Sequence, residues 1–193
     1  MSDSLNPTLW RTCRMLANSR RLKIIQHLID NGPLTLTELA TASSMSLPAC
    51  SQYTRQITAR GLCRETRKGT YAFFDLYPDP SIPYSPYLLL GIIESLLRKK
   101  QDYTEPIADL TAYTHVRRIM IVNYLFKEES ARLCDMQQDL PISEAALLRH
   151  LNKLISRKVV SRSENECYHL LKPPTMLSKK LLMIATGSYL HTS

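Results

Sequence analysis

The sequence contains little glycine: 5 of its 193 residues are glycine, and they form no phosphate-binding loop. Long apolar runs are also missing, because stretches such as 87–93 are far shorter than the roughly 20 residues of a membrane-spanning helix. No nucleophile motif of an enzyme is present. The N-terminus has no basic-then-apolar signal pattern. We therefore expect a cytoplasmic protein that is neither an enzyme nor inserted in a membrane.

Cysteine is scarce and widely spaced, which argues against a disulfide framework and against a metal site. The five cysteines are Cys13, Cys50, Cys63, Cys134 and Cys167. An odd, scattered set in a cytoplasmic chain is typical of free thiols. No pair has C-x-C or C-x-x-C spacing, whereas a soft metal normally takes three or four thiolate or imidazole ligands. We expect no metal and no cofactor.

Acidic residues are outnumbered by basic ones. The chain has 17 acidic and 25 basic side chains, which gives a formal net charge of +8. Such an excess favours an anionic partner such as nucleic acid or a membrane surface, although many soluble proteins are equally basic without one. Apolar residues make up 44% of the chain, which is enough for packed cores.

The chain contains an internal repeat in which residues 20–74 align with 117–171 without a gap. The identical pairs are Arg20/Arg117, Arg21/Arg118, Ile24/Ile121, Leu28/Leu125, Leu36/Leu133, Ser46/Ser143, Ala49/Ala146, Arg60/Arg157 and Tyr71/Tyr168. The apolar positions between them also stay in phase, which implies the same helices and strands twice. We therefore predict two homologous domains.

The first copy begins with two predicted helices. Residues 20–29 are amphipathic; Ser19 can cap this helix, and residues 31–33 (NGP) end it. Thr35 and Glu38 fit a capping box at the start of the second helix.

A third helix and a hairpin complete the unit. Ser46 can cap the third helix, which has Pro48 in its first turn and runs to about Arg60. Two β-prone runs, 62–67 and 70–76, read as a hairpin. This order is that of a winged helix-turn-helix, in which the third helix enters the DNA major groove and the hairpin, or wing, lies beside it. The second copy predicts helices at 116–126, 131–139 and 143–157 and strands at 159–162 and 167–171.

Several segments of the first copy resemble ArsR-type repressors. Residues 16–25 (LANSRRLKII) are similar to the entry helix of that family, 46–53 (SLPACSQY) with 60–62 to the recognition helix and its exit, and 67–74 (RKGTYAFF) to the wing. The second copy resembles the family in outline. The resemblance implies a repressor that binds duplex DNA and whose terminal helices form a dimer interface. Thr54 departs from the family pattern, in which a buried leucine is usual.

The third helix of the first copy carries polar side chains that would project outward if Ala49 and Ile57 face the core. Arginine and glutamine suit bidentate hydrogen bonds with base edges, hydroxyl groups can bind phosphate, and basic wing residues would meet the backbone. The candidate contacts are Ser51, Gln52, Tyr53, Arg55, Gln56, Arg67 and Lys68. A merely solvated helix would carry similar residues, so the assignment depends on the motif around them.

The second copy is less suited to DNA. It offers Arg149, His150, Asn152 and Lys153 at the matching positions. Its wing is acidic (164–166, ENE) and would repel phosphates. Residues 1–100 carry 13 basic and 7 acidic side chains, and residues 101–193 carry 12 and 10, so the net charges are +6 and +2. We infer that the first copy binds DNA more strongly and that the two different helices read an asymmetric site.

Three further stretches, 7–16, 87–99 and 177–189, have helical periodicity outside the aligned copies. The family resemblance implies that such helices pair the two halves; alternatively, each packs on its own domain. We predict a mainly α fold with small β-hairpin wings, in which two tandem winged helix-turn-helix domains form an intramolecular pseudo-dimer. The domains are 1–80 and 101–193, with a connecting helix in 81–100, and further self-association is left open.

These features predict a regulator that binds duplex DNA sequence-specifically. The alternative is a protein-interaction scaffold, because tandem winged helices also occur in chromosome-condensation and transcription complexes. The basic first wing and the helix of Gln52 and Arg55 favour DNA. The acidic second wing and the apolar 87–99 helix favour protein interaction for that half.

Overall fold

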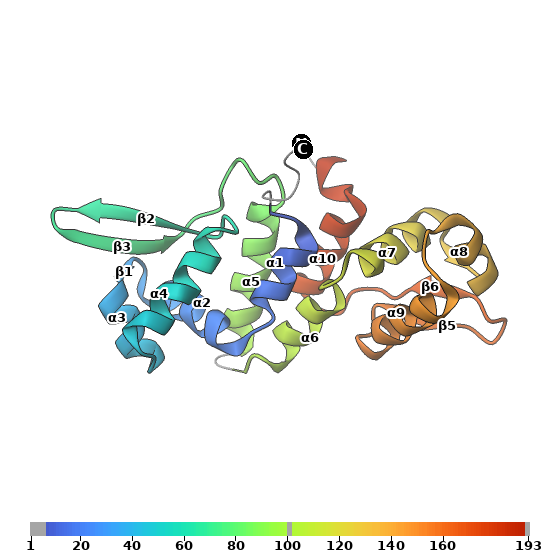
Figure 1. The fold of residues 1–193 in the computed structure, drawn as a ribbon, viewed down its shortest axis with the longest axis horizontal. Coiled ribbons are helices and arrows are strands. Elements are labelled where there is room, and N and C mark those ends of the chain that lie inside the picture. Colours follow the sequence, from blue (N-terminus) through green and yellow to red (C-terminus); the bar gives the residue numbers. More distant parts are fainter. Residues whose placement is uncertain (1–6, 100–101, 192–193) are drawn as a thin grey trace.

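The computed structural model describes residues 7–99 and 102–191 (Figure 1). The first half contains α1 (Leu9–Leu16), α2 (Ser19–Asn31), β1 (Leu34–Thr35), α3 (Leu36–Ser43), α4 (Leu47–Thr58), β2 (Cys63–Lys68), β3 (Tyr71–Leu76) and α5 (Ser85–Lys99). The second half contains α6 (Thr104–Ala112), α7 (Val116–Glu128), β4 (Ser130–Ala131), α8 (Leu133–Asp139), α9 (Glu144–Ser156), β5 (Val160–Arg162), β6 (Tyr168–Leu170), α10 (Met176–Thr186) and the 3-10 helix η1 (Ser188–His191). Within these ranges no helix is both long and apolar enough to cross a membrane.

The two halves share an order of elements and a sheet topology, and the fold is mainly helical with small sheets, as predicted. Each half has a three-stranded antiparallel sheet, ordered β1-β3-β2 and β4-β6-β5. In the first sheet β2 and β3 pair over their full six residues, so this hairpin projects well beyond the helices (Figure 1). The β5–β6 hairpin has only three paired residues on each strand.

Side-chain caps define the starts of the first helices. Asn18 caps α2, because its Oδ1 accepts hydrogen bonds from the backbone N–H groups of Arg20 and Arg21 at 3.0 and 3.3 Å. The predicted cap at Ser19 was therefore wrong by one residue: Asn18 has the extended backbone that aims a cap at the first turn. The capping box of α3 is confirmed, since Glu38 N–H donates to Thr35 Oγ1 and Thr35 N–H donates to Glu38 Oε2.

The sequence analysis missed helix α6 and the short strands β1 and β4. Helix α6 buries Pro106, Leu110 and Ala112 and packs against α1 and α10. With nine residues and only a few apolar positions, it is too short to give a clear periodic signal. The two strands are two residues long and form only because β3 and β6 offer them an edge.

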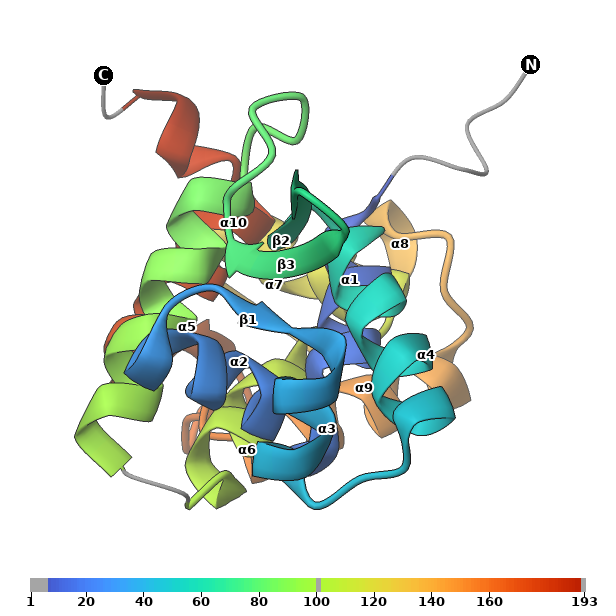
Figure 2. The same ribbon diagram turned by 90° about the vertical axis from the view of Figure 1, so that its left-hand side faces the viewer.

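Helix pairs join the two halves. Helix α5 packs along α10, as both views show, and α1 packs against α6 (Figure 2). Leu88 and Ile92 of α5 and Leu177 and Leu181 of α10 are buried in one hydrophobic cluster that extends through both halves.

Gly91 lies where α5 comes closest to α10. A Cβ atom at this position would be 3.2 Å from Leu177 Cα and 3.3 Å from Lys180 Cβ. One turn earlier, the ring of Tyr87 packs against that of Tyr189 with centroids 5.4 Å apart. The missing side chain of Gly91 therefore permits the close helix contact.

Replacing Gly91 with valine should lower the free energy of unfolding by about 1–3 kcal/mol, because the added methyl groups overpack the α5–α10 contact. Glu94→Val is the matched control: it places valine at an exposed position of the same helix and should change stability by less than about 0.5 kcal/mol. Denaturant titration measures both. Since valine has a better intrinsic helix propensity than glycine, a Gly91→Val protein as stable as the wild type would contradict close packing here.

Candidate nucleic-acid interface

Helix α4 presents a polar strip to solvent. Gln52 and Arg55 are exposed on this strip, and Ser51 and Gln56 are half-buried at its edges. A shallow hollow of about 460 Å³ runs along it and is lined by Pro48, Ser51, Gln52, Arg55, Gln56 and Ala59. Side chains with base-reading chemistry thus stand on the accessible side of the helix.

The opposite side of α4 is buried and shows how Thr54 occupies a position where the ArsR-type pattern has a buried leucine. This residue is 1% exposed, and its hydroxyl donates to the Cys50 carbonyl oxygen at 2.8 Å, so the buried polar group is satisfied within the helix. Cys50 and Ile57 are fully buried beside it. Cys50 therefore acts as a small hydrophobic residue.

Tyr53 is half-buried, unlike the exposed Gln52 and Arg55, and Arg21 lies over its ring. The guanidinium carbon of Arg21 is 5.2 Å from the ring centroid, and Arg21 Nη1 donates to the Met15 carbonyl oxygen. Desolvation lowers the pKa of Arg21, but an arginine stays charged at neutral pH. Tyr53 thus holds a positive charge at the edge of α4, while contact of its own hydroxyl with phosphate stays a prediction.

The β2–β3 hairpin has a basic tip, at the position where the sequence predicts the wing residues Arg67 and Lys68. Gly69 and Thr70 form the turn, and Gly69 has a φ of 63°, which glycine adopts without strain. The side chain of Arg67 is 83% exposed, and Lys68 is exposed beside it. Glu65 Oε1 lies 3.8 Å from Arg67 Nε, an ion pair that is weak in solvent and leaves the tip available to an anion.

Helix α9 occupies the corresponding place in the second half. Arg149, Asn152 and Lys153 are exposed on it. The expected outward position of His150 was wrong: its side chain is 6% exposed, and its ring lies 4.5 Å from that of His115, centroid to centroid. His150 therefore belongs to the packing between α9 and the start of α7, and we remove it from the candidate contacts.

The two histidines sit among positive charges. His115 caps α7, because its Nδ1 accepts the backbone N–H of Arg117 at 3.1 Å. Burial, followed by the charges of His115, Arg118, Arg149 and Arg117, lowers the pKa of His150 to about 4. Burial and nearby arginines also lower the pKa of His115. Both imidazoles are thus neutral at neutral pH, as their packing requires.

The second hairpin differs from the first in length and charge. Its strands are joined by residues 163–167, which include the exposed Glu164 and Glu166. Arg162 Nη2 donates to Glu166 Oε1 at 2.8 Å, so the basic side chain nearest the tip already has an acidic partner. This short wing offers a phosphate no favourable charge.

Metal-ligating side chains do not gather in the part of the chain that the structure describes: it holds no group of three or more His, Cys, Asp or Glu residues placed to bind an ion. All five cysteines are free thiols. Burial raises the pKa of Cys63 to about 11, as expected of an unreactive thiol in the core.

The two exposed helices lie on one side of the molecule. Figure 2 places α4 and α9 towards one side of the view and α5 and α10 towards the other.

Comparison with known proteins agrees with this geometry. The family model described as winged helix-turn-helix DNA-binding matches residues 18–62, which span α2, α3 and α4. The first half contains a winged helix-turn-helix. The chain is also similar to the arsenic resistance transcriptional regulator ArsR1 of Pseudomonas putida, with 25% identity over 107 residues, or 55% of this chain and 77% of that protein. No solved structure matches the chain. The comparisons thus support a DNA-binding regulator.

The sequence analysis did not select the arginines of α1 and α2, of which Arg11, Arg14 and Arg21 line one hollow with Gln56 and Arg60. A signal was present: residues 7–29 contain five basic and no acidic side chains. The segment was interpreted only by its apolar periodicity, and the one-sided charge was overlooked.

The packing of the buried His150 against His115 predicts acid sensitivity. As the pH falls from about 6.5 towards about 4, the unfolded chain protonates His150 first, so the free energy of unfolding decreases across this window. His150→Leu should lose less stability than the wild type between these pH values, as measured by denaturant titration at each pH. Asn152→Leu, an exposed and non-titrating neighbour, should follow the wild type. Parallel curves for His150→Leu and wild type would contradict the low pKa.

Proposed function

We propose that the protein is a sequence-specific transcriptional repressor that reads duplex DNA with α4 and α9 of one chain. The observation that carries this proposal is the pair of exposed base-reading side chains, Gln52 and Arg55, on the third helix of a winged helix-turn-helix beside a basic wing. From the relative in Pseudomonas putida we carry over the role of transcriptional regulator.

In this proposal the second half is a second, divergent winged helix-turn-helix. Its support is the gapless alignment of 117–171 with 20–74 and the shared order of helices and strands. The pairing of α5 with α10 and of α1 with α6 supports an intramolecular pseudo-dimer. Gln52 and Arg55 in one helix and Arg149 and Asn152 in the other then favour an asymmetric operator.

A protein-interaction role for the second half is the competing proposal. It is favoured by the short acidic wing and by two large apolar side chains exposed on α7, Val116 at 47% and Phe126 at 48%. The scaffold and DNA roles differ in their dependence on salt, because binding through phosphates releases counterions.

Fluorescence anisotropy with a labelled random duplex tests the DNA role. We expect the affinity to fall on the order of 100-fold between about 50 and about 200 mM salt, as several phosphate contacts require. Weak binding that does not respond to salt would overturn the proposal and favour the scaffold.

Binding-site selection with the intact chain should return an asymmetric sequence. Arg55→Ala and Asn152→Ala should each relax the preference in a different half of the site, by about 1–3 kcal/mol per lost base contact. The control is Arg67→Ala, which should remove about one phosphate contact. It should therefore lower the slope of log affinity against log salt by about 1 and leave the sequence preference unchanged. A perfect palindrome, or loss of preference in the same half for both helix variants, would contradict two distinct recognition helices.

A further inference from the structure

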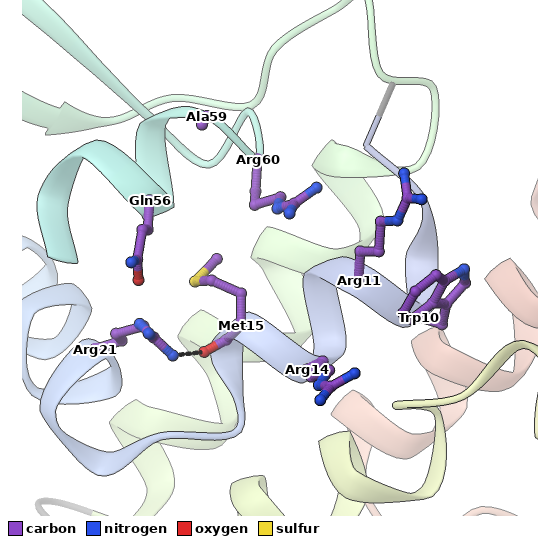
Figure 3. A pocket seen from close by; sticks show the side chains of 8 residues that line it. All are labelled: Trp10, Arg11, Arg14, Met15, Arg21, Gln56, Ala59 and Arg60. Carbon is purple, nitrogen blue, oxygen red and sulfur yellow. Dashed lines mark hydrogen bonds between the residues drawn. The ribbon is translucent and has the colours of Figure 1, made fainter. Parts of the chain in front are cut away.

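A hollow lined by arginines lies between the start of the chain and the inner edge of α4 (Figure 3). Its volume is about 510 Å³, and its lining residues are Trp10, Arg11, Arg14, Met15, Arg21, Gln56, Ala59 and Arg60. The four guanidinium groups come from three segments of the chain: α1, α2 and the turn after α4. Segments apart in the sequence thus bring their positive charges together at one place.

The described residues that line the hollow include no Asp or Glu. The surrounding sequence is equally one-sided: residues 7–29 and 39–64 hold eight basic and no acidic side chains. Arg21 is the most constrained of the four, since it lies over Tyr53 and its buried Nε has no hydrogen-bond partner.

The hollow adjoins the DNA-reading surface. Gln56 and Ala59 line both this hollow and the one along the outer strip of α4, so the two hollows are neighbours. On the other side, Arg14 is near enough to His115, at the start of α7, to disfavour its protonation. The hollow therefore lies between the recognition helix of the first half and the helices of the second.

We propose that this arginine hollow binds the phosphodiester backbone at the centre of the duplex, between the two stretches read by α4 and α9. The inference rests on the proposed function. A duplex that reaches two recognition helices about one helical turn apart must pass over the surface between them. Its backbone would there meet Arg14, which is exposed, and Arg11 and Arg60, which are half-buried. The contact adds affinity without reading bases, and it makes binding sensitive to the path of the DNA backbone.

An open site of this size suits a strand of consecutive phosphates better than one enclosed anion. The lining guanidinium groups differ in exposure, from the partly buried Arg21 to the exposed Arg14. Guanidinium groups at different depths can contact successive phosphates of one DNA strand from the edge of the hollow inward. A single phosphate would leave most of the volume of the hollow empty.

The test uses the full chain and two charge-removing variants, Arg14→Gln and Arg60→Gln. Each should reduce the slope of log affinity against log salt by about 0.9 for a random duplex, because each loses one phosphate contact. Lys179→Gln is the matched control: it removes one exposed positive charge from α10, on the side away from α4 and α9, and should leave the slope unchanged. Thermal unfolding of each variant checks that the fold is intact.

A second arm locates the contact on the DNA. Neutral methylphosphonate links at the centre of a selected site should weaken binding by the wild type and should have little further effect on the Arg14→Gln/Arg60→Gln double variant. Equal weakening of both proteins would overturn the inference.

The arms separate the hollow from the proposed function and from a free anion. If the wild type binds DNA without salt dependence, the proposed function fails. If it binds with salt dependence but the two arginine variants match Lys179→Gln, only the hollow inference is overturned. Inorganic phosphate provides the last outcome. If it binds saturably, if Arg60→Gln abolishes this binding, and if the salt dependence of DNA binding is the same in all variants, the hollow binds a small anion and the inference is overturned.

Discussion

The contact between α5 and α10 fixes how the two halves sit relative to each other, and the DNA-facing side depends on it. Helices α4 and α9 belong to different halves, so their separation is set by the helix pairs that join these halves. Half-sites on B-DNA repeat about every 34 Å, and a reader with a fixed spacing needs no rearrangement to match them. Joining both halves in one chain also removes the entropic cost of assembling two separate subunits. The absence of a side chain at Gly91 is what allows this contact to be close.

Two exchanges at equivalent positions of the repeat, on either side of a shared arginine, account for much of the difference between the halves. Asn18, Arg21 and Tyr53 of the first half correspond to His115, Arg118 and His150 of the second. In the first half an arginine lies over a phenol ring and lines an accessible hollow. In the second half two imidazoles pack together, and Arg118 is only 7% exposed. The same position thus carries an accessible charge beside α4 and a buried one beside α9.

Sequence patterns correctly predicted those features that residues close together in the sequence determine. The capping box of Thr35 and Glu38 and the end of α2 at Gly32 follow from neighbouring residues, and both are confirmed. The predictions failed where a contact with a residue distant in the sequence determines the position of a side chain. His150 has the position of an outward residue on a helical wheel, but the ring of His115 covers it from another helix. Likewise the arginine hollow is assembled from three separated segments, so no single stretch of sequence displays it.

Ion pairs with acidic residues are found on the hairpins, whereas the described lining of the arginine hollow contains no acidic residue. On the hairpins, arginines have carboxylate partners: Arg64 lies 3.7 Å from Asp75, and Arg162 lies 2.8 Å from Glu166. The hollow gathers guanidinium groups with no acidic residue among its described lining, so their mutual repulsion opposes the folded state. A polyanion laid across them removes that repulsion and binds the folded arrangement in preference to the unfolded chain. DNA binding and folding are therefore coupled by mass action. Duplex DNA should stabilise this face most where its positive charges have the fewest acidic neighbours.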